Sequence, residues 1–254
     1  MDSLSSMEPV YSLLIWIFRA FAGFGGHKVT RVGSHHLPKS GGGVLAINHT
    51  GYLDFTYASQ EVWRTDKRRI RFMAKAELQN YALIKFLMRR CRVIPVDRHA
   101  GRESYVEAIK ELHAGELVGV YPESTIGRSF ELKSFKTGAA RMALEADMSI
   151  YPLIVWGAQR IVTKGHRNLG RTKTPVAIAV GEPIAAAGTK EELTAALRVA
   201  MEKLLHEVQD AYGAHPAGEF WVPKRLGGGA ISLEEAEEID RQVAAERAAQ
   251  RKAS

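Results

Sequence analysis

The 254-residue chain has little cysteine and no long apolar run, and each shortage excludes a class of protein. Cys91 is the single cysteine, so we expect no internal disulfide, no cysteine-based zinc site, and a reducing compartment. An almost entirely apolar stretch, residues 10–24, falls short of the roughly 20 residues that span a bilayer, and Arg19 interrupts it. Asp2 and Glu8 precede this stretch where a secretory signal would carry basic residues. We therefore expect neither a membrane span nor a cleaved signal.

Positive charge is unevenly distributed along the chain. The net charge is +7, but residues 64–102 hold twelve lysines and arginines against three acidic residues, a local excess of +9. Such a concentration favours an anionic partner, which could be a phosphate-bearing small molecule, an anionic membrane surface or nucleic acid. Aromatic residues that could stack on bases are few in this region, so we expect no nucleic acid partner. A non-enzymatic basic protein that binds lipid or nucleic acid is the alternative from outside the enzymes.

Apolar strand patterns alternate with helical patterns, which is typical of an α/β fold. Strands are predicted at residues 28–33, 69–75 and 92–96, and fully buried strands at residues 44–47, 117–121, 150–156 and 175–180. Helices are predicted at residues 55–63, 81–88, 101–113 and 189–212, and Thr189 with Glu192 begins the last of them with a capping box. We expect a single α/β domain, residues 27–212, with a central, mostly parallel sheet flanked by helices. Residues 1–26 are predicted to form an apolar helix that lies in the membrane interface or packs on the domain. Residues 213–254 are predicted as a Gly/Pro-rich linker and a charged helix, which Ser232 and Glu235 begin with a capping box.

A histidine and an aspartate lie five residues apart directly after the first buried strand. These are His49 and Asp54. Five helical steps of about 100° would set them about 140° apart, so they cannot share a face of one straight helix. We expect His49 in a turn before a helix, with Gly51 letting the backbone bend until the imidazole meets the carboxylate. Asp54 would then hold one ring nitrogen, and the other could take a proton from a hydroxyl. A histidine that only caps a helix is the structural alternative.

Two further strand ends carry side chains suited to anions. Strand 117–121 is followed by carboxylate, hydroxyl and guanidinium groups on Glu123, Ser124, Thr125 and Arg128. Arg98 follows strand 92–96 in the same manner. If the strands are parallel, these ends meet at one edge of the sheet, where ligands bind in open α/β sheets. Surface salt bridges by the arginines, and a carboxylate at a helix N-terminus, are the structural alternatives.

Taken together, these motifs resemble the conserved blocks of the glycerophospholipid acyltransferase family, which includes the 1-acylglycerol-3-phosphate acyltransferases. Asn48, His49 and Asp54 match the block N-H-x4-D, and Asp97-Arg98 looks like the second block. Residues 121–125 match the start of F-P-E-G-T-R-S, and residues 151–153 look like the fourth block, a Val-Pro-Val strand. Two departures lie in the third block. Ser124 replaces the glycine, and Ile126 stands where arginine is usual, so Arg128 is the candidate for the missing charge.

The resemblance implies transfer of a fatty acyl group from acyl-CoA or acyl carrier protein to the free hydroxyl of lysophosphatidic acid (1-acyl-glycerol-3-phosphate), giving phosphatidic acid. His49 would be the catalytic base and Asp54 its partner, with substrate bound by Asn48, Arg98, Glu123, Ser124, Thr125 and Arg128. No cofactor and no metal ion are expected. The protein would act at the cytoplasmic face of the cell membrane, on an anionic lipid surface. Another lysolipid or a phosphosugar lipid remains open as acceptor, and a serine hydrolase is the rival enzyme class, although no G-x-S-x-G sequence occurs.

Overall fold

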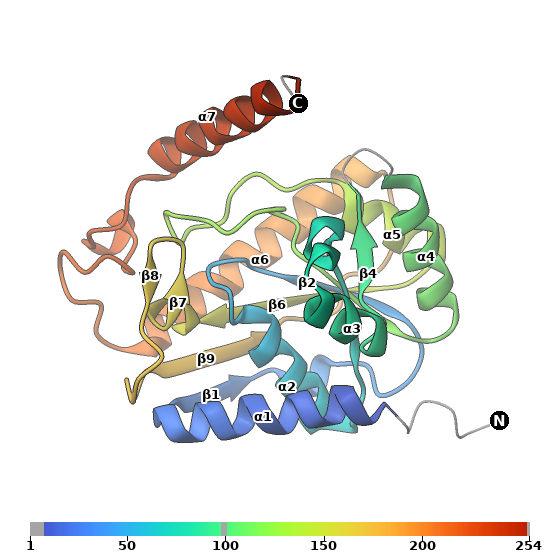
Figure 1. The fold of residues 1–254 in the computed structure, drawn as a ribbon, viewed down its shortest axis with the longest axis horizontal. Helices are drawn as coiled ribbons and strands as arrows, with labels where there is room; N and C mark the ends of the chain where they lie inside the picture. Colours follow the sequence, from blue (N-terminus) through green and yellow to red (C-terminus); the bar gives the residue numbers. More distant parts are fainter. Residues whose placement is uncertain (1–7, 98–100, 253–254) are drawn as a thin grey trace.

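A seven-stranded sheet forms the centre of the protein (Figure 1). The computed structural model describes residues 8–97 and 101–252. The strand order is β1-β9-β6-β2-β5-β3-β4, with bounds β1 Lys28–Val32, β2 Gly43–Ile47, β3 Ile70–Lys75, β4 Ile94–Val96, β5 Leu117–Val120, β6 Ile150–Trp156 and β9 Pro175–Val180. The strands from β6 to β4 run parallel, whereas β9 is antiparallel to β6 and pairs in parallel with β1. The predicted single α/β domain with a mostly parallel central sheet is confirmed.

Helices lie close to the segments where the sequence predicts them. They are α1 Pro9–Gly25, α2 Asp54–Asp66, α3 Ala82–Arg90, α4 Gly101–His113, α6 Lys190–Tyr212 and α7 Leu233–Lys252. Two elements were not predicted: α5, Gly138–Ala146, and the hairpin of β7, Val162–Thr163, with β8, His166–Arg167. Helix α5 is short and rich in alanine, so its buried face carries few large apolar side chains. Its formation depends on burial between the sheet and the neighbouring helices.

Both faces of the sheet are buried, which explains why its central strands are apolar throughout. In β2, Val44 and Ala46 pack in a core with α4, α5 and α6. The alternate residues, Leu45 and Ile47, pack in a second core with α2 on the opposite face. Because successive side chains of a strand point to opposite faces, one short apolar run serves both cores.

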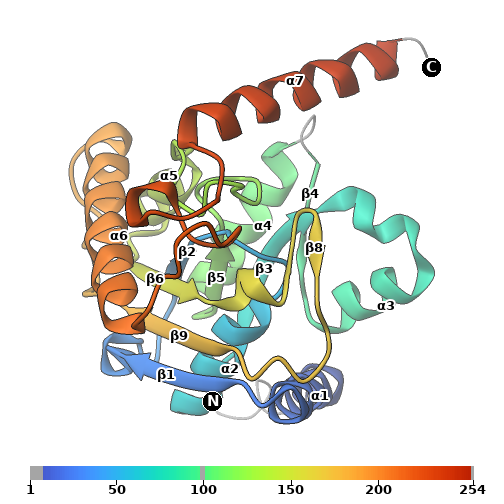
Figure 2. The same cartoon turned by 90° about the vertical axis from the view of Figure 1, so that its left-hand side faces the viewer.

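The segment between α6 and α7 contributes side chains to the core. Trp221 and Val222 are buried in the first core, and the Trp221 ring lies 6.4 Å from that of Trp156 in β6. Helix α7 then begins with the predicted capping box, because Ser232 and Glu235 each accept the backbone N–H of the other. Figures 1 and 2 show α7 beginning beside the body of the protein and extending away from it.

Helix α1 packs on the domain through one face only. Tyr11 and Ile15 are buried beside Cys91, and Trp63 of α2 packs against the same cluster. The Tyr11 hydroxyl accepts the backbone N–H of Ile70 in β3 at 3.2 Å. Within the part of the chain that the structure describes, no helix is long and apolar enough to cross a membrane.

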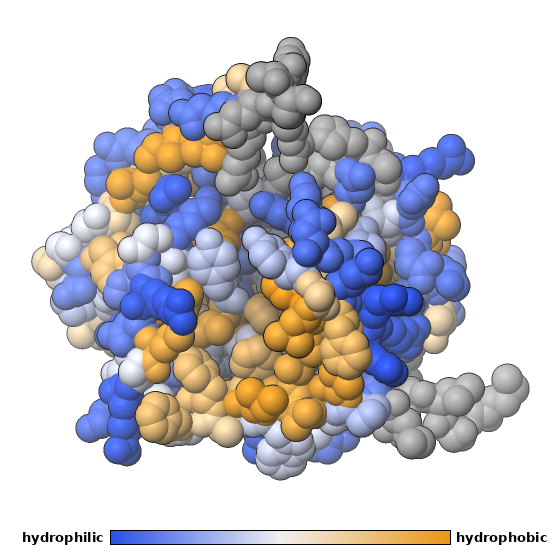
Figure 3. Space-filling model, in the orientation of Figure 1, coloured by the Kyte–Doolittle hydropathy of each residue, from blue (hydrophilic) through white to orange (hydrophobic). Residues whose placement is uncertain are grey.

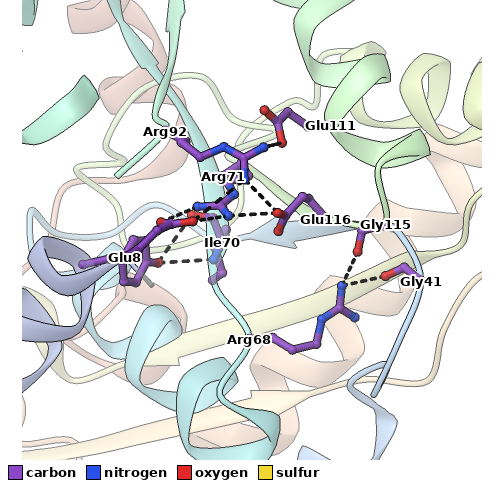
Figure 4. Close-up of polar contacts among 10 residues, drawn as sticks. Glu8, Gly41, Arg68, Ile70, Arg71, Arg92, Glu111, Gly115 and Glu116 are labelled. Carbon is purple, nitrogen blue, oxygen red and sulfur yellow. Dashed lines mark hydrogen bonds and ion pairs between the residues drawn. The ribbon is translucent and has the colours of Figure 1, made fainter. Parts of the chain in front are cut away.

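A buried arginine ties the start of α1 to the sheet (Figure 4). Arg71 of β3 is 1% exposed and donates to both carboxylate oxygens of Glu8, at 2.6 and 2.8 Å. It also donates to Glu116 at 2.9 Å, and Arg92 joins the network through Glu116 and Glu111. Burial opposes ionisation of Glu116, but Arg71 and Arg92 outweigh it and hold the pKa of that carboxyl below its usual value.

This network changes the interpretation of the basic stretch 64–102. Besides Arg71 and Arg92, Arg68 is also used inside the fold, because its guanidinium donates to the carbonyls of Pro38, Gly41 and Gly115. Part of the local positive charge is therefore structural. By contrast, Lys85, Arg89 and Arg90 on α3 lie exposed at the surface, where an external partner can reach them.

We expect Arg71→Met to lower the free energy of unfolding by about 3–5 kcal/mol, because it leaves two partly buried carboxylates without their main partner. Urea unfolding followed by circular dichroism measures this change. Lys110→Met is the matched control, since Lys110 is 72% exposed and its pair with Glu107 lies on the surface. The control should change stability by less than about 1 kcal/mol. Equal effects of the two substitutions would contradict a structural role for the Arg71 network.

Candidate active site

The ends of two neighbouring parallel strands bring the candidate residues together. Ala46 of β2 is paired with Val120 of β5, so the turns that follow these strands leave the sheet at the same edge. The β2 turn carries His49, and the loop after β5 carries Glu123. Strand β4 ends at the same edge but lies beyond β3. Arg98, which the sequence places after β4, lies outside the described residues.

His49 and Asp54 meet across the turn between β2 and α2. The His49 Nδ1 atom lies 3.2 Å from the Asp54 Oδ2 atom. The same oxygen accepts the backbone N–H groups of Thr50 and Gly51, both at 2.8 Å. Asp54 is fully buried at the first position of α2. Burial raises the pKa of its carboxyl, while the hydrogen bonds from His49, Gly51 and Thr50 oppose that shift.

The glycine in this turn has a different purpose from the one predicted. Gly51 does not adopt the left-handed conformation that only glycine tolerates easily. Instead, a Cβ atom at Gly51 would lie 2.8 Å from the carbonyl oxygen of Val162 in β7. Tyr52 also donates its backbone N–H to this oxygen, at 3.0 Å. Glycine is needed here because the β7–β8 hairpin passes close to the turn.

The His49 ring is held between a buried acid and the solvent. It stacks on the Tyr121 ring, with 3.9 Å between centroids and 20° between planes. The His49 side chain is 19% exposed, and its Nε2 atom makes no hydrogen bond to any described residue. An ionised carboxylate can only accept hydrogen bonds, so with Asp54 ionised Nδ1 of His49 is the donor in this contact. Nε2 then carries the lone pair and can accept a proton.

Glu123 fixes the backbone around His49. Its Oε1 accepts the backbone N–H of His49 at 2.8 Å, and its Oε2 accepts that of Lys133 at 3.1 Å. Gly127 adds a further bond by donating to the His49 carbonyl at 2.8 Å. Burial raises the pKa of Glu123 to about 7, although the two backbone bonds favour its charged form. Both oxygens of Glu123 thus bind backbone, and the side chain is buried, so a contact of Glu123 with substrate stays a prediction.

Asn48 is likewise engaged within the protein. Its side chain donates to the carbonyl of Val155 at 3.0 Å and accepts the N–H of Val155 at 2.7 Å. Asn48 is fully buried, so it joins the end of β2 to β6 and fixes the start of the His49 turn. A contact with substrate remains a prediction, but this geometry gives Asn48 a positioning role.

The remaining predicted residues lie along the loop after β5. Ser124 is exposed with φ of +62°, a left-handed conformation, which explains why the family block has glycine at this place. Arg128 is half-buried, and its Nε atom is without a hydrogen-bond partner among the described residues. The Thr125 hydroxyl accepts a hydrogen bond from Lys133 Nζ.

Sequence reasoning missed three charged residues beside these. Lys133 and Lys164 both form ion pairs with Asp240 of α7. No local pattern marks them, because Lys133 lies in an irregular loop, Lys164 in an unpredicted hairpin and Asp240 in a distant helix. In the described ranges, no group of three or more His, Cys, Asp or Glu side chains could hold a metal ion.

The chain belongs to the acyltransferase family, since a sequence model of that family matches residues 28–156. This segment contains every block on which the sequence resemblance was based, and the resemblance is confirmed. The chain is 29% identical over 195 residues to the 1-acyl-sn-glycerol-3-phosphate acyltransferase of Bacillus subtilis, covering 73% of this chain and 89% of that protein. It is 27% identical over 170 residues to the protein of the same description from Borreliella burgdorferi, covering 64% of this chain and 62% of the relative.

The fold also matches a solved structure. The crystal structure of the 1-acyl-sn-glycerophosphate acyltransferase PlsC from Thermotoga maritima aligns with a TM-score of 0.62 at 20% identity. The alignment covers 80% of this chain and 84% of that one. At this level of identity, the match supports the fold.

Substituting Glu123 should change how stability depends on pH. The folded protein holds the Glu123 proton up to about pH 7, whereas the ordinary pKa is 4.5. The raised pKa means that protonated Glu123 stabilises the folded protein. This contribution to the free energy of unfolding is complete below about pH 4.5 and is lost as pH rises to about 7, a difference of about 3 kcal/mol. We expect Glu123→Gln to remove this slope, so that its free energy of unfolding falls less than that of the wild type between pH 5 and 8. Urea unfolding across this range measures it.

Glu202→Gln is the control for this experiment, because Glu202 lies exposed on α6 and the substitution removes one surface carboxylate. Its stability should follow the wild-type dependence on pH. Parallel curves for Glu123→Gln and the wild type would show that Glu123 is ionised in the folded protein at all these pH values.

Proposed function

We propose that the protein transfers a fatty acyl group from acyl-CoA or acyl carrier protein to the free hydroxyl of lysophosphatidic acid, giving phosphatidic acid. Family membership supports acyl transfer, and the descriptions of the relatives support this acceptor. The observation that carries the proposal is the pair of His49 and Asp54, with the outer ring nitrogen accessible at the sheet edge.

His49 would act as the general base. A hydroxyl has a pKa far above 7, so it must lose its proton as it attacks the thioester carbonyl. His49 Nε2 takes this proton, and Asp54 stabilises the resulting imidazolium through Nδ1. The new C–O bond forms, the C–S bond breaks, and the imidazolium returns the proton to the departing thiolate. The acceptor hydroxyl is itself the nucleophile, so the reaction needs no covalent enzyme intermediate and no cofactor.

The surrounding polar groups would keep the base in position. Asn48 fixes the residue before His49, Glu123 binds the backbone N–H of His49, and the Tyr121 ring supports the imidazole from one face. A base that is oriented before the substrate arrives loses little freedom in the reaction. Arg128, with its unpaired Nε atom, is the described residue of the predicted set that best suits the acceptor phosphate.

We expect His49→Ala to lower acyl transfer at least about 100-fold, because the base is removed. Asp54→Asn should lower it at least about tenfold, because the imidazole loses its charged partner. The assay measures phosphatidic acid by mass spectrometry after incubation with lysophosphatidate, with acyl-CoA and acyl carrier protein as alternative donors. Comparison of the two donors also decides the donor class.

His113→Ala is the matched control, since His113 is exposed at the end of α4 and should leave activity unchanged. Thermal unfolding establishes that each variant is folded. If folded His49→Ala retains more than a tenth of the activity, His49 is not the base. Thioester cleavage without an acceptor requirement would instead indicate a hydrolase.

We also propose that the protein acts on an anionic membrane surface. The outward face of α1 carries exposed Leu13, Trp16, Ile17 and Phe24, which follow one stripe of the helix. Exposed Leu83 and Phe86 of α3 extend this apolar surface beside α1. Figure 3 shows apolar side chains gathered over these two helices. Such a surface is typical of a helix that lies in the interface plane of a bilayer.

Basic side chains border the apolar surface. The Arg19 guanidinium lies 4.9 Å from the centroid of the Trp16 ring, and the Lys67 ammonium lies 3.8 Å from that of Trp63. Lys85, Arg89 and Arg90 lie on α3. Apolar insertion and attraction to anionic headgroups would therefore act together.

We expect the double substitution Leu13→Gln and Ile17→Gln to weaken binding to phosphatidylglycerol vesicles at least about tenfold, because less apolar area enters the bilayer. Co-sedimentation measures the binding. Val199→Gln is the control, since Val199 is 66% exposed on α6, away from this surface. Unchanged co-sedimentation of the double variant would mean that α1 does not contact lipid.

A further inference from the structure

Two lysines and a threonine hold a carboxylate from the C-terminal helix. Lys133 Nζ lies 2.9 Å from Asp240 Oδ2, and Lys164 Nζ lies 3.2 Å from Asp240 Oδ1. The Thr125 hydroxyl lies 3.4 Å from Oδ2 and also contacts Lys133 Nζ. Each carboxylate oxygen thus contacts a different ammonium group. The residues of this cluster come from three segments that are distant in sequence: the loop after β5, the β7–β8 hairpin and α7.

This cluster adjoins the His49 turn on two sides. The backbone N–H of Lys133 bonds to Glu123, whose other oxygen accepts the N–H of His49. On the other side, the Thr163 hydroxyl donates to the carbonyl of Thr50 at 2.7 Å. Lys164 follows Thr163, so its backbone lies one residue, about 3.8 Å, further along the chain. Both lysines therefore extend from segments bonded directly to the turn or to its supporting acid.

The cluster carries more positive than negative charge. The Lys133 and Lys164 side chains are 7% and 23% exposed. Burial lowers the pKa of Lys164, Asp240 raises it, and nearby Arg128 and Lys133 lower it further. Two ammonium groups thus face a single carboxylate, and Arg128 adds positive charge near Lys164. Burial opposes ionisation of Asp240, yet the two lysines hold its pKa below the usual value.

We propose that Thr125, Lys133 and Lys164 form a subsite for a phosphate group, and that the Asp240 carboxylate occupies this subsite until phosphate displaces it. A phosphate monoester carries a charge of about −1.5 to −2 at neutral pH and has three acceptor oxygens. It therefore neutralises the cluster better than one carboxylate does. That this phosphate belongs to an acyl-transfer substrate rests on the proposed function, whereas the existence of the subsite does not.

The attachment of α7 allows such an exchange. Ala236 is the only fully buried residue of α7 among the residues whose side chains are described. Glu234, Glu235, Glu238, Arg241 and Gln242 are all exposed. The hold of α7 on the loop after β5 therefore depends strongly on Asp240. Loss of its ion pairs would release this part of the helix without opening the main core.

The test is isothermal titration of the full chain with inorganic phosphate, sn-glycerol 3-phosphate and coenzyme A, at an ionic strength of about 0.15 M to screen distant charges. The variants are Asp240→Asn, Lys164→Gln and the two combined. Glu238→Gln is the matched control, because it removes one carboxylate from the same helix without touching the lysines. Lys133 is left intact because it is buried.

Asp240→Asn should bind phosphate about tenfold more tightly than the wild type, as expected if the carboxylate occupies the subsite about nine-tenths of the time. The combined variant should lose this gain, and Glu238→Gln should stay within about twofold of the wild type. If Asp240→Asn gains more affinity for glycerol 3-phosphate than for coenzyme A, the subsite belongs to the acceptor. A larger gain in affinity for coenzyme A would assign it to the donor. The proposal would be overturned if Asp240→Asn left the affinity for phosphate unchanged. It would also be overturned if Asp240→Asn raised this affinity equally in the presence and absence of the Lys164→Gln substitution.

The outcome can be separated from that of the acyl-transfer proposal. The combination His49→Ala with Asp240→Asn should keep the tighter phosphate binding even though it lacks the base. In an otherwise intact enzyme, Asp240→Asn should lower the KM of whichever substrate carries the phosphate and leave kcat largely unchanged. A change in kcat alone would contradict displacement by a substrate.

Discussion

The Asp54 carboxylate is the constraint on which the site depends. It is fully buried, and its Oδ2 atom receives hydrogen bonds from the His49 ring and from two consecutive backbone N–H groups. Burial of a carboxylate is unfavourable unless hydrogen bonds compensate it. The turn therefore folds around this oxygen, and its conformation also determines which nitrogen of His49 faces outward. One side chain thus sets both the local backbone and the orientation of the proposed base.

Around this turn, buried polar groups hold backbone rather than ligand. Asn48 joins the His49 turn to β6, and Glu123 joins it to the loop after β5. Their residue types match the family blocks, but their atoms are used within the protein. This arrangement leaves half-buried Arg128 and Lys164, with the buried Lys133 behind Asp240, as the charged groups that we propose for an anionic substrate.

The distribution of charge and apolar surface gives the protein two distinct regions suited to parts of a lipid. The apolar faces of α1 and α3, bordered by basic residues, suit a lipid surface. The cationic cluster beside the loop after β5 suits phosphate, and α7 now supplies its counter-charge. A lipid acceptor has both an acyl chain and a phosphate, so a protein with both regions could engage each end of such a molecule.

The sequence alone determined most of the elements and the turn between His49 and Asp54, but not α5 or the β7–β8 hairpin. Apolar runs placed the strands, capping boxes placed the starts of α6 and α7, and the spacing of His49 and Asp54 required a turn between them. These features depend on residues close together in the chain, where periodicity and local hydrogen bonds decide the conformation. Only the tertiary structure decided that Gly51 serves a close approach and that Arg71 is structural. It alone brought Asp240 to Lys133, 107 residues away, because such contacts depend on how distant segments pack together.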